Sequence, residues 1–188
     1  MVDRGQKYKD FPKVHKTWLY SPGENASKWD MCLSQNIMCI GWDEMGNLLD
    51  YSSKEDMTIK LQEIYEKTEA SFKNDSLALW EFTHEMQIGD IVIVKKGQNQ
   101  MIGRGIVESD YVYDETLPDF RHVRKMQWTN IGEWKSASKN VQKTLTDISK
   151  YPDYVKKLEK LFEEKSQKYY WWLVANPQNM EPFENTRW

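Results

Sequence analysis

Short apolar runs, each bounded by turn residues, constrain the fold of this chain more than any other feature of its sequence. Thr17 to Tyr20, Ile37 to Trp42 and Asp90 to Val94 have the length and residue types of β-strands. Two further strands are expected at Met101 to Val107 and at Val123 to Trp128. The long strand–helix alternation of a doubly wound parallel sheet is missing. The pattern therefore predicts an α+β fold, built on a small bent β-barrel of five to six strands flanked by helices.

Four helices are expected before, between and after these strands. The first covers about 25–34, and the second follows a capping box formed by Ser53 and Asp56. A third covers about 75–86. The fourth begins at Pro152, a residue that is favoured in the first turn of a helix. The helices are thus expected to flank the barrel, and they do not alternate one for one with its strands.

The two ends of the chain differ from its middle. Residues 1–15 are polar and mostly basic, which predicts a flexible leader, with a DNA-binding arm as the alternative. Residues 16–168 hold the strands and helices of one domain. Within 169–188, the run WLVANP repeats the aromatic, apolar and proline pattern of WLYSP near the start. This segment is predicted to be a terminal strand and tail, which either completes the sheet or opens a second, similar domain.

The composition argues against a basic nucleic-acid coat. The formal net charge is −3 although 29% of the residues are charged, so any phosphate contact must come from a local patch. The chain also has nine tryptophans, a residue that is rarely buried completely. This surplus indicates an aromatic stacking surface.

The chemistry-bearing residues do not form a catalytic or metal-binding pattern. The three histidines and two cysteines have no metal or triad spacing, and no phosphate-binding glycine loop is present. No apolar run reaches the length of a membrane span or forms a signal peptide. We therefore expect a cytoplasmic binding domain that is not an enzyme and uses no cofactor or metal.

Four segments in combination resemble the EVE family, a group of PUA-like relatives of YTH domains. They are TWLYSPGENASKWD, IGWDEMGNL, LWEFTHEMQIGDIVIV and GRGIVESDYVYDETLPDFRHVRKMQW. The order and spacing of IGWDEMG, EMxxGD and GxGxVxxDYxYD are the most specific part of the resemblance. Within this group the chain is most similar to the N-terminal DNA-recognition domain of McrB-family modification-dependent restriction proteins.

The resemblance implies that one nucleotide, turned out of the duplex, enters a pocket lined by aromatic rings. By position, the pocket rim comes from the ends of two strands and from the loop 111–120. The residue pattern agrees, since Trp42 follows an apolar run and precedes a turn. Trp18 is compatible with a wall of the pocket or with the core. The expected base-binding cage consists of Trp42, Asp43, Tyr20, Ser21, Tyr111, Tyr113 and Trp18.

Basic residues close to this expected cage are candidates for phosphate contacts, which position a duplex without specifying its sequence. They lie in the run that follows Phe120, in the turn after the strand 90–94, and between two glycines. Acidic residues are interleaved with the first group, so a solvated strand face is the alternative there. The candidates are Arg121, His122, Arg124, Lys125, Lys95, Lys96 and Arg104.

The sequence therefore predicts a reader of DNA that carries a modified base, expected to be methylated. Such a module would be the targeting part of a modification-dependent restriction system. Its expected partners are double-stranded DNA and further domains or subunits, namely an AAA+ GTPase and a nuclease, with no membrane involved. Two other hypotheses remain open at this point. One is a YTH-like reader of a modified nucleotide in RNA, and the other is a module that binds a protein or a small metabolite.

Overall fold

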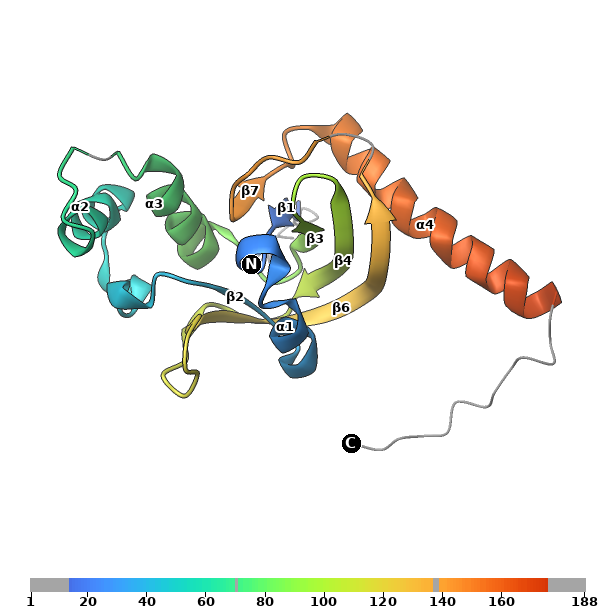
Figure 1. Ribbon diagram of the computed structural model, residues 1–188, viewed down its shortest axis with the longest axis horizontal. Helices are drawn as coiled ribbons and strands as arrows, with labels where there is room; N and C mark the ends of the chain where they lie inside the picture. Colours follow the sequence, from blue (N-terminus) through green and yellow to red (C-terminus); the bar gives the residue numbers. More distant parts are fainter. Residues whose placement is uncertain (1–13, 70, 137–138, 176–188) are drawn as a thin grey trace, which may run out of the picture.

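A strongly curled mixed sheet forms the centre of the molecule (Figure 1). The computed structural model describes residues 14–69, 71–136 and 139–175, with the backbone alone beyond residue 163. The strand order is β2-β6-β4-β3-β1-β7, and β5 pairs with β6 outside this path. β1 runs parallel to β3, and the other pairs are antiparallel. The strands are β1 (Thr17–Tyr20), β2 (Ile37–Ile40), β3 (Ile91–Lys96), β4 (Gln100–Val107), β5 (Val112–Tyr113), β6 (His122–Lys135) and β7 (Leu145–Asp147).

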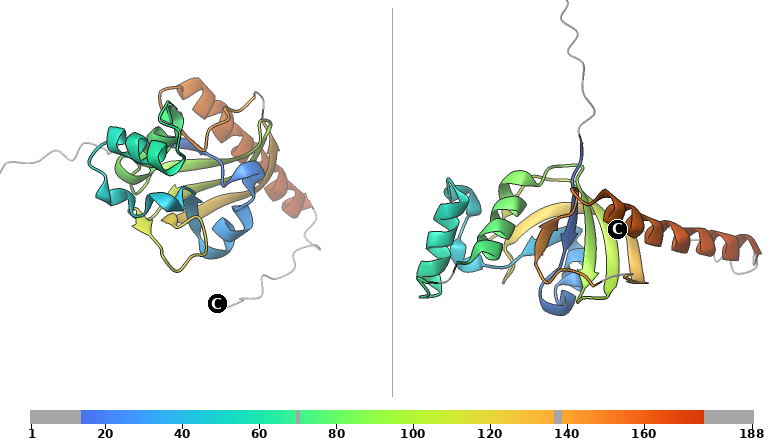
Figure 2. Two further views of the ribbon diagram at one scale, coloured as in Figure 1. Left: turned by 60° about the vertical axis from the view of Figure 1, so that its left-hand side comes forward. Right: turned by 90° about the horizontal axis from the view of Figure 1, so that it is seen from above.

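Helices lie at both sides of the curled sheet (Figures 1 and 2). α2 and α3 pack on each other at one side, and α4 contacts β6 at the other. α2 begins at the predicted cap, where the Ser53 hydroxyl accepts a hydrogen bond from the Asp56 amide at 3.1 Å. The main helices are α1 (Trp29–Gln35), α2 (Lys54–Ile64), α3 (Lys73–Trp80) and α4 (Pro152–Ala175), with short 3-10 helices at Glu24–Ala26, Asp43–Met45 and Leu48–Asp50 and a π-helical turn at Glu81–Glu85. The α+β class and the bent sheet are confirmed, with seven strands where five to six were expected.

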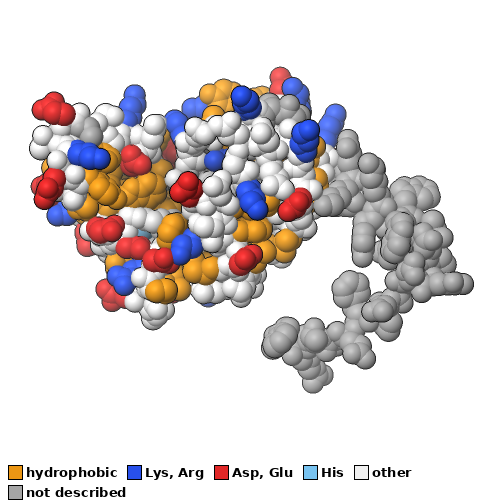
Figure 3. Space-filling model, in the orientation of Figure 1, with side chains coloured by type: hydrophobic (Ala, Val, Ile, Leu, Met, Phe, Trp, Pro, Cys, Tyr) orange, Lys and Arg blue, Asp and Glu red, His pale blue; other side chains and the backbone are white. Residues whose placement is uncertain are grey.

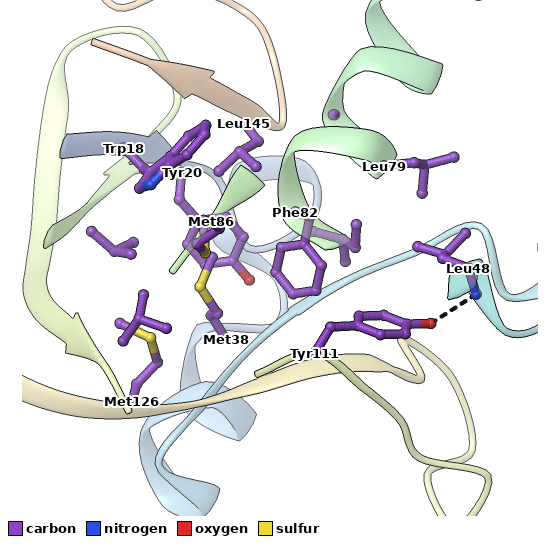
Figure 4. Packing of buried hydrophobic residues seen from close by; sticks show 14 of the residues in the cluster. Trp18, Tyr20, Met38, Leu48, Leu79, Phe82, Met86, Tyr111, Met126 and Leu145 are labelled. Atoms are coloured by element: carbon purple, nitrogen blue, oxygen red, sulfur yellow. Dashed lines mark hydrogen bonds between the residues drawn. The ribbon is translucent and has the colours of Figure 1, made fainter. Parts of the chain in front are cut away.

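The sheet buries apolar side chains on both faces. Trp18 and Tyr20 of β1 lie in the core inside the curl, together with Met38, Phe82 and Met86 (Figure 4). Leu19, between Trp18 and Tyr20, points to the other face of the sheet, because side chains alternate along a strand. On that face a second cluster lies beneath α4, made of Leu19, Ile93, Met101 and Trp134 of the strands with Leu158 and Phe162 of the helix. β1 is therefore a central strand without a solvated face.

The two glycines of the GRG segment are explained by tryptophan packing. A β-carbon on Gly103 would lie 2.6 Å from Trp29 Cη2, and one on Gly105 would lie 2.6 Å from Trp128 Cε3. The two indole rings meet edge to face with centroids 4.9 Å apart. The glycines thus let α1 and β6 approach β4 closely, and they are packing residues.

Gly105→Ala is expected to lower the free energy of unfolding by about 1–3 kcal/mol, the usual cost of overpacking a core. The added methyl would also lie 2.9 Å from the backbone oxygen of Gln127, which cannot move aside as a side chain can. Gly41→Ala is the matched control, because its β-carbon would meet Phe120 at an ordinary 3.6 Å. Urea unfolding of both variants checks this. Equal stability of the two would contradict the packing role.

Three elements differ from the sequence expectation. β2 ends at Ile40, two residues before Trp42, and β6 continues to Lys135. α4 extends to Ala175, so its helical backbone covers 169–175, where a terminal strand was predicted. Residues 1–13 of the expected leader and 176–188 of the expected tail lie outside the described residues.

Candidate functional site

A cavity of about 690 Å³ opens where the ends of β1 and β2 meet two loops. This volume falls within the usual range of small-molecule sites. The segment 139–144 after β6, called the strap below, closes one side of the cavity. A hydrogen bond from the Ser21 amide to the Thr144 carbonyl at 2.9 Å ties it to the end of β1. The lining residues are Ser21, Gly23, Glu24, Asn25, Gly41, Trp42, Asp43, Glu44, Tyr65, Lys95, Gly97, Gln98, Asp119, Phe120, Gln142, Lys143 and Thr144.

Two aromatic residues of this wall have strained backbones. Trp42 has φ 69° and Phe120 has φ 55°, both in the left-handed region that bulky residues rarely adopt. Such conformations cost about 1–3 kcal/mol each and persist only where the surroundings hold them. They cluster at functional sites, so their presence in one cavity wall marks this cavity as the candidate site.

The carboxylate of Asp43 holds both strained residues in place. It accepts hydrogen bonds from the backbone amides of Phe120 at 2.8 Å and Arg121 at 2.7 Å. Since Asp43 directly follows Trp42, this one side chain joins the end of β2 to the loop before β6. We refer to this arrangement as the Asp43 clamp.

A buried hydrogen-bonded chain supports Trp42 from behind. His122 is fully buried, and its Nε2 lies 3.1 Å from the Trp42 carbonyl oxygen, which can only accept. The other ring nitrogen, Nδ1, therefore accepts from the Tyr111 hydroxyl at 2.8 Å, and that hydroxyl accepts from the Leu48 amide (Figure 4). Burial lowers the pKa of His122, which favours this neutral form. His122 is thus a structural support, not a phosphate contact.

Four of the expected cage residues do not line the cavity, and three of these four lie in the main core. Trp18 is fully buried, and its indole donates to Asp90 at 2.8 Å. Tyr20 is fully buried, and its hydroxyl donates to the Cys39 carbonyl at 2.5 Å. Tyr111 belongs to the hydrogen-bonded chain described above. The ring of Tyr113 lies tilted against that of His122, and its hydroxyl is 3.5 Å from the Asp43 carbonyl. Of the expected cage, the cavity wall contains Trp42, Asp43 and Ser21.

The expected phosphate-binding residues are divided between interior and surface. Arg124 is 1% exposed, and its guanidinium donates to the carbonyls of Phe82, Thr83 and Ser109. It therefore caps the π-helical turn and is not available to a phosphate. Arg104 is paired with Glu159 of α4 at 3.0 Å.

The remaining basic candidates lie at or near the surface, with one exception. Lys96 and Lys125 are exposed, and Arg121 is partly exposed with its Nε donating to the Leu117 carbonyl. Lys95 is the exception, because it is only 4% exposed and lines the cavity.

Sequence reasoning missed much of the cavity wall. Phe120 was expected only as the end of a loop, and neither Tyr65 nor the strap residues 142–144 were expected at all. The strap has no periodic pattern, and it reaches the site through backbone hydrogen bonds such as that from the Asn140 amide to the Gln98 carbonyl. A left-handed tryptophan likewise has no local sequence signal.

Neither a metal centre nor a membrane-spanning helix is found among the described residues. No group of three or more histidine, cysteine, aspartate or glutamate side chains in this part of the chain is arranged to hold a metal ion. Among the helices that the structure describes, none combines the length and the apolar character needed to cross a membrane.

Comparison with known proteins gives a family without a known function. A family model described as "Domain of unknown function (DUF8426)" matches residues 18–152, which is more than half of the chain. The match runs from the second residue of β1 to the first residue of α4, and hence covers every residue of the cavity wall. No curated protein sequence matched the chain. The chain belongs to the DUF8426 family.

Proposed function

We propose that this domain binds DNA carrying a modified base and holds the turned-out base in the cavity lined by Trp42 and Phe120. The observation that carries the proposal is the presence of two strained aromatic residues in one cavity wall. Turning a base out of a duplex costs a few kcal/mol, and stacking on an aromatic ring returns about 1–3 kcal/mol. Two rings in the wall are therefore enough to offset most of this cost.

Selectivity for the modification requires more than apolar area. Burying one methyl group contributes about 0.8 kcal/mol, which is roughly a fourfold preference. Hydrogen bonds to the base edge must supply the rest. Because the Asp43 carboxylate already accepts two backbone hydrogen bonds, we assign base-edge contacts to the other polar residues of the wall, chiefly Ser21, Asn25, Gln98 and Gln142.

The charge distribution favours contact with few phosphates. Acidic and basic side chains are interspersed on the face in Figure 3, which has no continuous basic region. At the cavity rim, Lys143 and the nearby Lys96 are exposed, as are Glu24 and Glu44. We therefore expect a shallow dependence of affinity on salt concentration, since its slope reports the number of phosphates neutralised.

The wider role follows from the resemblance to McrB-type recognition domains. We propose a PUA-like, non-catalytic targeting module of a modification-dependent restriction system in the cytoplasm. Its GTPase and nuclease activities would reside in other domains or subunits. The curled sheet and the position of the cavity at the strand ends are compatible with this assignment.

Trp42→Ala is expected to weaken binding of a modified duplex by roughly 5- to 150-fold, the loss of about 1–3 kcal/mol of stacking. The measurement is a titration at fixed salt with a panel of duplexes carrying methylated cytosine, methylated adenine or no modification. Tyr151→Ala is the matched control, since it removes an aromatic ring that is 54% exposed at the start of α4.

The same panel distinguishes the proposal from its alternatives. Equal affinity for modified and unmodified duplexes would overturn it. A preference for matched RNA would instead indicate an RNA reader, because only RNA offers the 2′-hydroxyl. Absence of any salt-dependent nucleic-acid binding would favour a protein or metabolite ligand.

A further inference from the structure

Lys95 is a buried lysine in the cavity wall that has no counter-charge. It is 4% exposed, although it lies one residue before the end of β3, next to the exposed Lys96. No described residue forms an ion pair or a hydrogen bond with its ammonium group. Burial lowers the pKa of Lys95, as expected for a cation that loses water and gains no partner.

The other charged residues of the wall are compensated or exposed. Asp119 is paired with Lys28 at 2.6 Å, and Asp43 accepts two backbone hydrogen bonds. Glu24, Glu44 and Lys143 are exposed to solvent at the rim. Lys95 is thus the one charge of the described wall that belongs to a largely buried side chain and has no counter-charge.

A β-bulge sets Lys95 apart from the rest of its strand. The pairing of β3 with β4 shifts between Val94 and Lys95, so Val94 pairs with Gly103 and Lys95 with Met101. The hairpin then turns at Gly97, which lines the same cavity and has φ 58°. Bulges commonly redirect a side chain beside a binding site.

We propose that Lys95 binds a phosphate group of the nucleotide whose base occupies the cavity, so that the site recognises a nucleotide and not a base alone. This inference rests on the proposed function. A neutral carbonyl of a base would offset a buried ammonium only in part, whereas a phosphate oxygen brings the missing negative charge. Lysine is a common phosphate ligand that acts as a point charge, so it needs no bidentate geometry.

The test compares Lys95→Met with wild type on two duplexes that contain 5-methylcytosine and on two that contain N6-methyladenine. One duplex of each pair is intact, and in the other both linkages that flank the modified base are uncharged methylphosphonates. On the intact duplex preferred by wild type, we expect Lys95→Met to bind roughly tenfold more weakly, with a salt slope lower by about one. On the methylphosphonate duplex, the two proteins are expected to bind equally.

Lys157→Met controls for net charge, because it removes a lysine exposed on α4 outside the cavity. Thermal unfolding is measured to check that Lys95→Met is folded, and Lys95→Gln serves as a second neutral variant. Equal affinity of Lys95→Met and wild type on the intact duplex would overturn the assignment, as would the same loss on both duplexes. In either case a preserved preference for the modified base leaves the proposed function standing. If wild type shows no such preference, the proposed function fails and this inference fails with it.

Discussion

Asp90→Ala is expected to lower the free energy of unfolding by about 4–5 kcal/mol or more, since it removes three hydrogen bonds to a charged group that contribute about 1.5–3 kcal/mol each. Asp90 is 2% exposed, and its carboxylate accepts from the backbone amides of Lys16 and Gln87 and from the indole of Trp18. These bonds join the start of β1, the turn before β3 and the core. Alanine would leave all three donors without their acceptor.

Thermal and urea unfolding measure this loss, which corresponds to roughly 10 °C in Tm for a chain of this length. Asp90→Asn keeps one acceptor oxygen and should lose less. Glu108→Ala is the matched control, because it removes an exposed carboxylate just after β4. A loss below about 1 kcal/mol for Asp90→Ala would show that other groups satisfy the three donors.

The role of Asp90 illustrates what the sequence alone could predict. The GD pair before an apolar run correctly predicted the start of β3, because local residue preferences set strand boundaries. The helix start predicted at Ser53 was confirmed for the same reason, with the Ser53 hydroxyl as the N-cap acceptor. The partners of Asp90 are up to 74 residues away, so no local pattern could reveal that its carboxylate holds β1.

The start of β6 shows the same limit for the candidate site. The run His122, Val123, Arg124, Lys125 suggested a basic, solvated surface, yet its first three residues are buried. The π-helical turn supplies two carbonyls that Arg124 binds, and Trp42, two residues after β2, supplies the carbonyl that His122 binds. Which charged side chains become buried depends on these long-range contacts.

Trp42 lines the cavity, but the sequence argument that placed it at the mouth of a barrel was incomplete. The run IMCIGW predicted a strand that ends in a tryptophan at the mouth of the barrel. The strand instead stops at Ile40, and Trp42 takes a left-handed conformation held by residues around position 120. A tryptophan has no intrinsic preference for this conformation. Tertiary contacts therefore place this ring.

Asp43→Ala is expected to abolish selective binding of a modified duplex, a larger effect than that of Trp42→Ala, because it releases both aromatic residues at once. The variant loses two charge-assisted hydrogen bonds, which lowers the free energy of unfolding by about 3 kcal/mol or more. Part of this loss is returned when the backbone strain at Trp42 and Phe120, about 1–3 kcal/mol each, relaxes. The net loss of stability should therefore be smaller than for Asp90→Ala, while the loss of binding is greater.

Asp43→Asn sharpens this test, since it preserves shape but turns one acceptor oxygen into an amide donor that faces a backbone amide. The asparagine variant should therefore bind almost as poorly as the alanine variant. Glu44→Gln is the matched control, because it neutralises the next residue of the wall, which is exposed. Duplex titrations at fixed salt and unfolding curves are measured on all three. Wild-type affinity of Asp43→Asn, with the fold intact, would show that the clamp does not position the rings and that Trp42 and Phe120 are held by their packing alone.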